Sequence, residues 1–396
     1  DPFQMWDSRV LYASQQLAAD KASSPEHVAL FGVNIDGTDH ELYTSAPGQQ
    51  IRHMPCATPK GLVVFVEAES ATGDGAGQLA SVRERRPHHS YLKLTEDPAF
   101  VYLCPSPLTN NQILVARRVS SGDANCGVYR LDADTGRIDL VFDSPDYHDF
   151  QAKLVRARPL PDGRSTPVDP KQRTGILYGL NCYDADARLQ PHLAPGTIRR
   201  LRVIEGVAER AGSTVNDRDN TSSVAAPEAT SGMPEIGRRL LGEAPVEEDG
   251  SFQVEIPSDI PVELQALDED GMALATCRWI WVKPKEKRGC IGCHEDPERI
   301  PENDFVSALK RPANQLTLPP ERRRWVGFRE HVMPILRIKC ATADCHGGTE
   351  APLRMADTSA TRAEDDARSA YVALVAPNES GVNEEAARLV NRRYVN

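Results

Sequence analysis

The chain of 396 residues is longer than one hydrophobic core usually serves, and its length predicts two or three domains. Hydrophobic residues make up 40% and charged residues 26%, which is typical of a globular protein. The formal net charge of −11 argues against nucleic acid as the main partner, because phosphate contacts need clustered lysines and arginines. The longest purely apolar run has about seven residues, far short of a membrane span. No positively charged start with an apolar segment behind it is present, so we expect any export signal to have been removed already.

Short strand patterns separated by turn residues fill the first part of the chain. The predicted strands lie at 9–13, 27–36, 61–67, 99–103, 112–117, 127–131, 137–142 and 175–180. Asp36-Gly37 and Asp134-Thr135-Gly136 are typical of tight turns between strands. The recurrence of strand, turn and strand predicts a partial β-propeller-like region of about four blades over residues 1–195. A β-sandwich is the alternative that the same pattern allows.

Four of the nine cysteines fall into two tight pairs, and each pair is followed at once by histidine. The pairs are Cys290-Ile291-Gly292-Cys293-His294 and Cys340-Ala341-Thr342-Ala343-Asp344-Cys345-His346. CxxCH is the attachment signature of c-type haem, in which two thiols bond to the haem edge and the adjacent imidazole ligates the iron. The sequence therefore predicts two covalently bound haems c, with His294 and His346 as the proximal iron ligands.

Two other interpretations of the cysteine pairs remain open. The four thiols could form one zinc site, and a CxxC pair could be a thioredoxin-like redox motif, although the strand-to-helix setting of that motif is missing here. Covalent haem explains both histidines and is the interpretation that we adopt. Because haem attachment of this kind occurs outside the cytoplasm, it predicts a periplasmic or extracellular protein.

The remainder of the chain changes character twice. Alternating patterns at 251–256, 262–267 and 277–282 predict a small β-sandwich domain over 196–312 that carries the first haem. Trp279 and Trp281 share one face of the third of these strands, where they either pack in the core or flank the haem. Helical spacing before Cys340 and at 362–376 predicts a helical cytochrome c-like domain over 313–396, which we expect to be incomplete.

Further ligand candidates lie outside the two motifs. His331, Met333 and Met355 are candidates for the sixth iron ligand of the second haem. His53, Cys56 and His148 are candidates for a metal site at the mouth of the propeller. The sequence leaves open whether the other cysteines are buried thiols or include one disulfide; these are Cys56, Cys104, Cys126, Cys182 and Cys277.

Several blocks of sequence resemble a known family. The blocks 242–252, 268–272, 278–282 and 288–296 look like the middle domain of the hydrazine synthase alpha subunit family. The runs 328–336 and 340–348 look like the cytochrome domain that follows it, and Tyr147 to Gln151 with the N-terminal strands is more loosely similar to its propeller. The resemblance covers most of the chain.

The resemblance implies that the middle-domain haem belongs to a site that joins nitrogen from nitric oxide and ammonia, and that the C-terminal haem passes electrons. It also implies a tyrosine just after the CxxCH that ligates iron and leaves the motif histidine to zinc. Glu298 occupies the comparable position here, and no tyrosine lies between His294 and Tyr371. We therefore expect His294 to bind iron and the first haem to be an ordinary electron-transfer haem.

Together these observations predict an extracytoplasmic dihaem c-type cytochrome that transfers electrons within a larger redox complex. Its acidic charge favours a basic redox partner. A haem enzyme acting on small nitrogen compounds and a structural propeller subunit carrying haems are the alternatives. An arc of about four blades leaves edge strands whose backbone N–H and C=O groups have no partner strand. We therefore expect further polypeptide beyond both ends, or neighbouring chains, to cover these edges.

Overall fold

A computed structural model describes residues 2–14, 28–44, 51–70, 73–121, 124–157, 160–185, 191, 193–208, 236–293, 296, 298–300, 306–323, 328–341, 345–347 and 370. These residues are mainly β, as predicted, with strands β1 to β19 and the single α-helix α1. The chain divides into two compact units. Unit 1 contains residues 1–175, 282–288 and 296–302, and unit 2 contains residues 176–281, 289–295 and 303–396.

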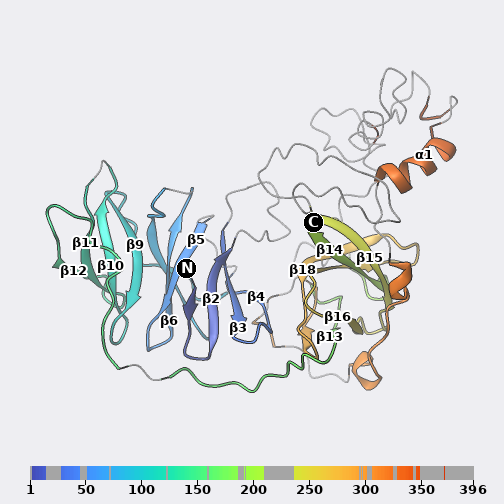
Figure 1. The fold of residues 1–396 in the computed structure, drawn as a ribbon, viewed down its shortest axis with the longest axis horizontal. Helices are drawn as coiled ribbons and strands as arrows, with labels where there is room; N and C mark the ends of the chain where they lie inside the picture. The colour runs from blue at the N-terminus through green and yellow to red at the C-terminus, as the bar shows by residue number, and fades with distance from the viewer. Residues whose placement is uncertain are drawn as a thin grey trace. The chain divides into compact units, whose positions relative to one another are not determined.

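Three four-stranded antiparallel sheets follow one another in unit 1 (Figure 1). The first contains β1 (Phe3–Gln4), β2 (Arg9–Ser14), β3 (Ala29–Asn34) and β4 (Glu41–Leu42). The second contains β5 (Ile51–Ala57), β6 (Leu62–Ala68), β7 (Gln78–Arg83) and β8 (Leu92–Lys93). The third contains β9 (Phe100–Pro107), β10 (Gln112–Val119), β11 (Gly127–Asp132) and β12 (Ile138–Phe142). In each sheet the strands pair in chain order, so every connection is a hairpin.

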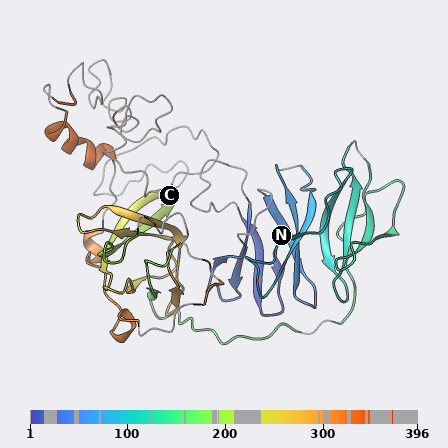
Figure 2. The ribbon, with the colours of Figure 1, turned by 180° about the vertical axis from the view of Figure 1, so that it is seen from behind.

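The three sheets lie side by side in both ribbon views (Figures 1 and 2), and apolar cores fill the space between neighbouring sheets. Between the first and second sheets, Leu11 and Leu30 pack with Phe65 and Val82. Between the second and third, the buried cluster contains Cys56, Val64, Val66, Leu79, Tyr102, Ile113, Val115 and Leu131. Because β6 sends alternate side chains to its two faces, it contributes Phe65 to one core and Val64 and Val66 to the other.

The number of repeated sheets differs from the prediction. We expected about four blades within residues 1–195, whereas the described residues there contain three four-stranded sheets, ending at Phe142. The last predicted strand exists as β13 (Thr174–Gly179), but it lies between β16 and β19 in another sheet. Its pattern predicted a strand, but only long-range pairing decided its sheet.

Two further sheets contain the remaining strands. One has the order β15 (Ile236–Pro245), β14 (Arg200–Ala208), β17 (Val262–Leu267) and β18 (Ala273–Ile280), and all its pairs are antiparallel. The other has the order β16 (Phe252–Pro257), β13 and β19 (Lys287–Cys290). In the first of them, Trp279 lies against Gly206, where a Cβ atom would come within 2.4 Å of the indole ring. The Arg238 guanidinium lies 5.7 Å from that ring, so Trp279 packs against its own sheet.

The helical elements with assigned bounds in the described part of the chain all lie after residue 307. Short 3-10 turns at Ala308–Lys310 and Pro320–Arg322 and a π-helical turn at Phe328–Val332 precede α1 (Met333–Lys339). Pro334 lies in the first turn of α1, where a missing backbone N–H is tolerated, so the helix begins at Met333 and continues through this proline to Lys339. The predicted helix at 362–376 lies outside the described residues except for Ala370. No helix within the described ranges has the length and apolar character needed to cross a membrane.

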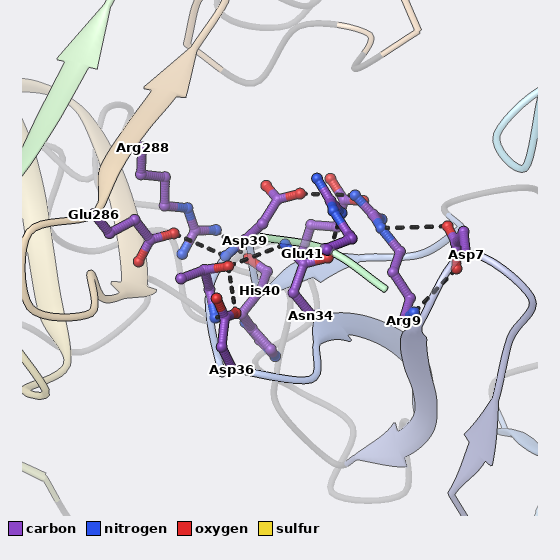
Figure 3. Close-up of polar contacts among 11 residues, drawn as sticks. Asp7, Arg9, Asn34, Asp36, Asp39, His40, Glu41, Glu286 and Arg288 are labelled. Atoms are coloured by element: carbon purple, nitrogen blue, oxygen red, sulfur yellow. Dashed lines mark hydrogen bonds and ion pairs between the residues drawn. The ribbon is translucent and has the colours of Figure 1, made fainter. Parts of the chain in front are cut away.

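A network of polar contacts joins the turn after β3 to residues 282–288 within unit 1 (Figure 3). The Glu286 carboxylate accepts hydrogen bonds from the backbone N–H groups of Asp39 (2.8 Å) and Lys283 (2.6 Å). The Arg288 guanidinium donates to the carbonyl oxygen of His40. Glu286 is only 4% exposed. Because its buried carboxylate accepts a hydrogen bond from each of the two amides, these bonds fix its position.

His40 makes this region sensitive to pH. Its ring is 3% exposed and stacks on Phe31 with the ring centroids 5.2 Å apart. Burial, together with the nearby Arg288 charge, lowers the pKa of His40 to about 4. The unfolded chain, with an ordinary histidine pKa near 6.5, therefore binds more protons between those two values, and the free energy of unfolding rises with pH across that window.

Replacing His40 by phenylalanine is expected to remove this pH dependence, because phenylalanine keeps the stacking and does not titrate. The lost slope corresponds to at most about 3 kcal/mol between pH 4 and pH 6.5. Urea unfolding of the parent and of His40→Phe at several pH values between 4 and 7 measures it. Equal slopes in the two proteins would contradict the assignment.

Candidate functional site

The first cysteine pair lies on a short loop of unit 2 that is held by its backbone. β19 ends at Cys290, whose carbonyl oxygen accepts a hydrogen bond from the Leu180 amide at 3.0 Å. The carbonyl oxygen of Ile291 accepts from the Asn181 amide at 3.1 Å, and the Cys293 amide donates to the carbonyl oxygen of Asp184 at 2.8 Å. Residues 290–293, which we call the first cysteine loop, thus pair with the segment that follows β13.

Close backbone approach explains the glycines in and before this loop. A Cβ atom at Gly292 would lie 2.0 Å from the carbonyl oxygen of Asp184, and one at Gly289 would lie 2.4 Å from the Tyr178 ring. Neither position has room for a side chain unless its neighbour moves. The glycine in the CxxCH spacing is therefore required by packing, in addition to any role in haem attachment.

The donor set of the first cysteine loop fits covalent haem attachment. Cys290 and Cys293 are both partly exposed, and the hydrogen bonds from their backbone fix the turn that separates them. Two accessible thiols on one rigid turn can reach the same edge of a porphyrin. His294, the predicted proximal ligand, lies outside the described residues.

The second motif follows α1 directly, as predicted. Cys340 caps the helix, and its amide donates to the carbonyl oxygen of Leu336 at 2.8 Å. The His346 amide donates to the carbonyl oxygen of Cys340 at 3.0 Å. Cys340 is a partly exposed free thiol and Cys345 an exposed one. Backbone hydrogen bonds thus link Cys340 both to α1 and to His346.

The candidates for the sixth ligand of the second haem differ in their surroundings. His331 is exposed in the π-helical turn before α1. Met333 is 1% exposed and packs in an apolar cluster with Ala370, Phe328 and Leu336. Met355 lies outside the described residues. The choice among the three stays a prediction.

His53, Cys56 and His148 have separate roles among the described residues. Cys56 is 1% exposed in the core between the second and third sheets, and burial raises the pKa of its thiol to about 12. Burial lowers the pKa of His53, whose Nε2 atom is buried without a hydrogen-bond partner in the described part of the chain. The Nδ1 atom of His148 accepts a hydrogen bond from the Cys126 amide at 3.3 Å.

No group of three or more His, Cys, Asp or Glu side chains within the described ranges is arranged to hold a metal ion. His53, Cys56 and His148 are therefore not gathered into one such group. Cys56, Cys104, Cys126 and Cys182, whose pairing the sequence left open, are free thiols in the described part of the chain. Burial raises the thiol pKa of both Cys104 and Cys126, which is typical of unreactive cysteines.

Sequence reasoning missed the contacts made by residues on either side of the first motif. Glu286 and Arg288 precede it and bind the turn after β3, as described above (Figure 3). Asp296 and Glu298 follow it and bind the loop between β7 and β8. The sequence signal available was the high density of charge next to the motif, but charge density alone does not reveal a partner more than 200 residues away.

The contacts after the motif involve a histidine pair and an arginine. The Asp296 carboxylate lies 2.6 Å from Nε2 of His89. The Glu298 carboxylate accepts hydrogen bonds from the His88 amide at 2.7 Å and from Nε of Arg86 at 3.3 Å. Burial alone would raise the pKa of Asp296, but the Glu298 amide and His89 outweigh it and lower that pKa.

Comparisons with known proteins agree with the sequence blocks described above. Residues 196–295 match the sequence model of the hydrazine synthase alpha subunit middle domain. Hydrazine synthase subunit alpha of Kuenenia stuttgartiensis is 26% identical over 453 residues, which cover 89% of this chain and 54% of that protein. The chain thus spans about half the length of this curated relative.

A solved structure of Kuenenia stuttgartiensis hydrazine synthase shares the fold, with a TM-score of 0.74 at 21% identity over 96% of this chain and 60% of that one. The match extends well beyond residues 196–295 and includes the sheets of unit 1. The family match covers the first cysteine loop, so the loop belongs to the matched domain. Residues 196–295 therefore resemble a hydrazine synthase alpha subunit middle domain, and the chain as a whole is similar to the hydrazine synthase alpha subunit over most of its own length.

Proposed function

We propose that this chain is an extracytoplasmic dihaem c-type cytochrome that transfers electrons within a larger redox complex. The observation that carries the proposal is the shape of the two cysteine motifs. In each motif both cysteines are at least partly exposed, backbone hydrogen bonds hold residues of the motif, and a histidine comes directly after the second cysteine. A zinc or dithiol role would not need a histidine next to both pairs.

The residues of this chain would hold haem in two ways. Cys290 and Cys293 would form thioethers to the first haem, and Cys340 and Cys345 to the second. His294 and His346 would bind the two irons, and the iron of a bound haem supplies one-electron transfer. The hydrogen bond from the Cys293 amide to Asp184, and that from the His346 amide to Cys340, would fix the thiols before attachment.

Glu298 supports electron transfer over catalysis at the first haem. The family resemblance implies a tyrosine iron ligand at this position, whereas the Glu298 carboxylate binds Arg86 and the His88 amide. Without a tyrosine ligand, His294 would stay on the iron as its proximal ligand. An iron that also has a ligand on its opposite side is six-coordinate, which suits electron transfer. If the reduced first haem bound carbon monoxide as readily as an open site, the alternative of a haem enzyme acting on small nitrogen compounds would replace this proposal.

The negative net charge of the chain supports a role in a complex with a redox partner. A net charge of −11 would steer a basic redox partner toward it, and its relative is named as one subunit of hydrazine synthase. The chain would work in the periplasm or outside the cell, where covalent haem attachment takes place. The propeller-like arrangement proposed for unit 1 would then serve as a platform for assembly.

Covalent attachment is tested by mass. After expression with a c-type haem maturation system and acid–acetone extraction, the intact chain is expected to retain two haem masses. The double variant Cys290→Ala/Cys293→Ala should retain one, as should Cys340→Ala/Cys345→Ala. The control Cys104→Ala, which removes a thiol outside both motifs, should retain both. A parent chain that retains no haem mass would overturn the proposed function.

The geometry of the first loop is tested at its glycine. Gly292→Ala would place a Cβ atom 2.0 Å from the carbonyl oxygen of Asp184 and force the two strands of chain apart. We expect it to lower the free energy of unfolding of the haem-free chain by about 1–3 kcal/mol and to reduce the haem bound per chain. Gly163→Ala is the matched control, because nothing lies within 4 Å of a Cβ atom there. If both variants behave like the parent, the loop is not fixed as described.

A further inference from the structure

The first haem motif is attached to unit 1 at both of its ends. The motif itself belongs to unit 2 through residues 289–295, but the residues immediately before and after, 282–288 and 296–302, belong to unit 1. On the upstream side the buried Glu286 carboxylate holds the Asp39 amide, and Arg288 binds the carbonyl oxygen of His40 (Figure 3). The start of the haem peptide is thus fixed by the Arg288 side chain, which comes directly before Gly289 and two residues before Cys290.

On the downstream side the anchor is Glu298, four residues after His294. One carboxylate oxygen accepts from the His88 amide at 2.7 Å and the other from Nε of Arg86 at 3.3 Å. The Glu298 side chain is 13% exposed, whereas the Arg86 side chain is 68% exposed. Both oxygens of the carboxylate therefore point into contacts within unit 1, and a charge-assisted hydrogen bond to a sheltered carboxylate is stronger than an exposed ion pair.

The contact spans a long separation in the sequence. Glu298 lies 210 residues after His88, and its partners stand on the loop between β7 and β8, next to the strands of the second sheet. Because β7 pairs with β6 in the middle of that sheet, the loop is carried by a well-packed element. Asp296, 2.6 Å from His89, adds a second contact to the same loop. Asp296 and Glu298 are consequently held by a loop more than 200 residues earlier in the sequence, in addition to the hydrogen bond from the Glu298 amide to the Asp296 carboxylate.

We infer that Glu298 is a positioning residue for the first haem, which holds the peptide after His294 on the β7–β8 loop through Arg86 and the His88 amide and does not itself ligate iron. The inference rests on the proposed attachment of haem at Cys290 and Cys293. Residues that do not bind a metal themselves but hold its ligands in place often control how firmly those ligands stay on the metal. Loosening this anchor should therefore let the His294 imidazole, or the ligand opposite it, leave the iron more often.

The test uses the full chain with the background substitutions Cys340→Ala/Cys345→Ala, so that only the first haem absorbs. In this background we expect Glu298→Gln to keep its covalent haem by intact mass and the six-coordinate spectrum of its oxidised iron. The fraction of reduced haem that binds carbon monoxide at a fixed low concentration should rise by about tenfold. Arg86→Gln, which removes the same ion pair from an exposed side chain, should change carbon monoxide binding in the same direction even if Glu298→Gln does not fold.

The matched control is Glu96→Gln, which breaks the exposed Lys93–Glu96 ion pair (3.4 Å) in the same unit and should leave carbon monoxide binding unchanged. Carbon monoxide binding equal to that of the parent in both Glu298→Gln and Arg86→Gln would overturn the inference. So would a change of the oxidised iron's spin state in Glu298→Gln alone, because that would identify Glu298 as an iron ligand.

These outcomes are separate from failure of the proposed function. If the background chain retains no haem by mass, the proposed attachment is wrong, and the inference falls with it. If the haem is attached and only the carbon monoxide response is absent, attachment stands and the positioning role alone is wrong.

Discussion

The hydrogen bond from the Cys293 amide to the carbonyl oxygen of Asp184 is the contact on which the candidate site depends. It holds the last cysteine of the first motif against the segment that follows β13, and it leaves no space for a side chain at Gly292. The loop therefore has little freedom between its two thiols. A group attached through both of them inherits that rigidity, which is what an electron-transfer centre requires if its iron is to keep the same ligands in both oxidation states.

The rigidity of the loop comes from its two flanks as well as from its own backbone. Glu286 before the motif and Glu298 after it are carboxylates whose oxygens accept N–H donors in unit 1. Buried or sheltered carboxylates of this kind are costly to leave unpaired, so each fixes the backbone that carries it. The first motif is thus a short segment of the chain between Glu286 and Glu298, whose carboxylates are both fixed by hydrogen bonds within unit 1.

The second sheet, whose β7–β8 loop binds Glu298, is itself strongly packed. Within the second sheet, Arg52 and Glu67 form a buried ion pair at 2.8 Å, and the Tyr91 hydroxyl donates to the same carboxylate at 2.6 Å. Burying such charges is favourable only when every one of them is paired, and here the guanidinium also lies 5.7 Å from the rings of Phe65 and Tyr91. This network lies in the same sheet as β7 and β8, whose loop binds Glu298.

The sequence by itself determined the elements whose signals are local. Alternation and turn residues placed β2, β3, β6 and β9 to β13 close to their observed positions, and Gly37 takes the positive φ of 82° that its turn requires. The spacing of cysteine and histidine located both motifs without any structure. β5 and β15 were missed, because Met54 and Leu241 sit beside register shifts that break the period of two. β7 and β14 were missed as well.

Only the tertiary structure decided which strands share a sheet and which charges meet. β13 has the pattern of its neighbours in sequence, yet it pairs with strands that come more than 70 residues later. Trp279 packs on Gly206, and Glu298 binds a loop 210 residues earlier. Local patterns reflect the period of one element and the chemistry of one turn, whereas these pairings depend on how distant segments bury their apolar faces and satisfy their charges together.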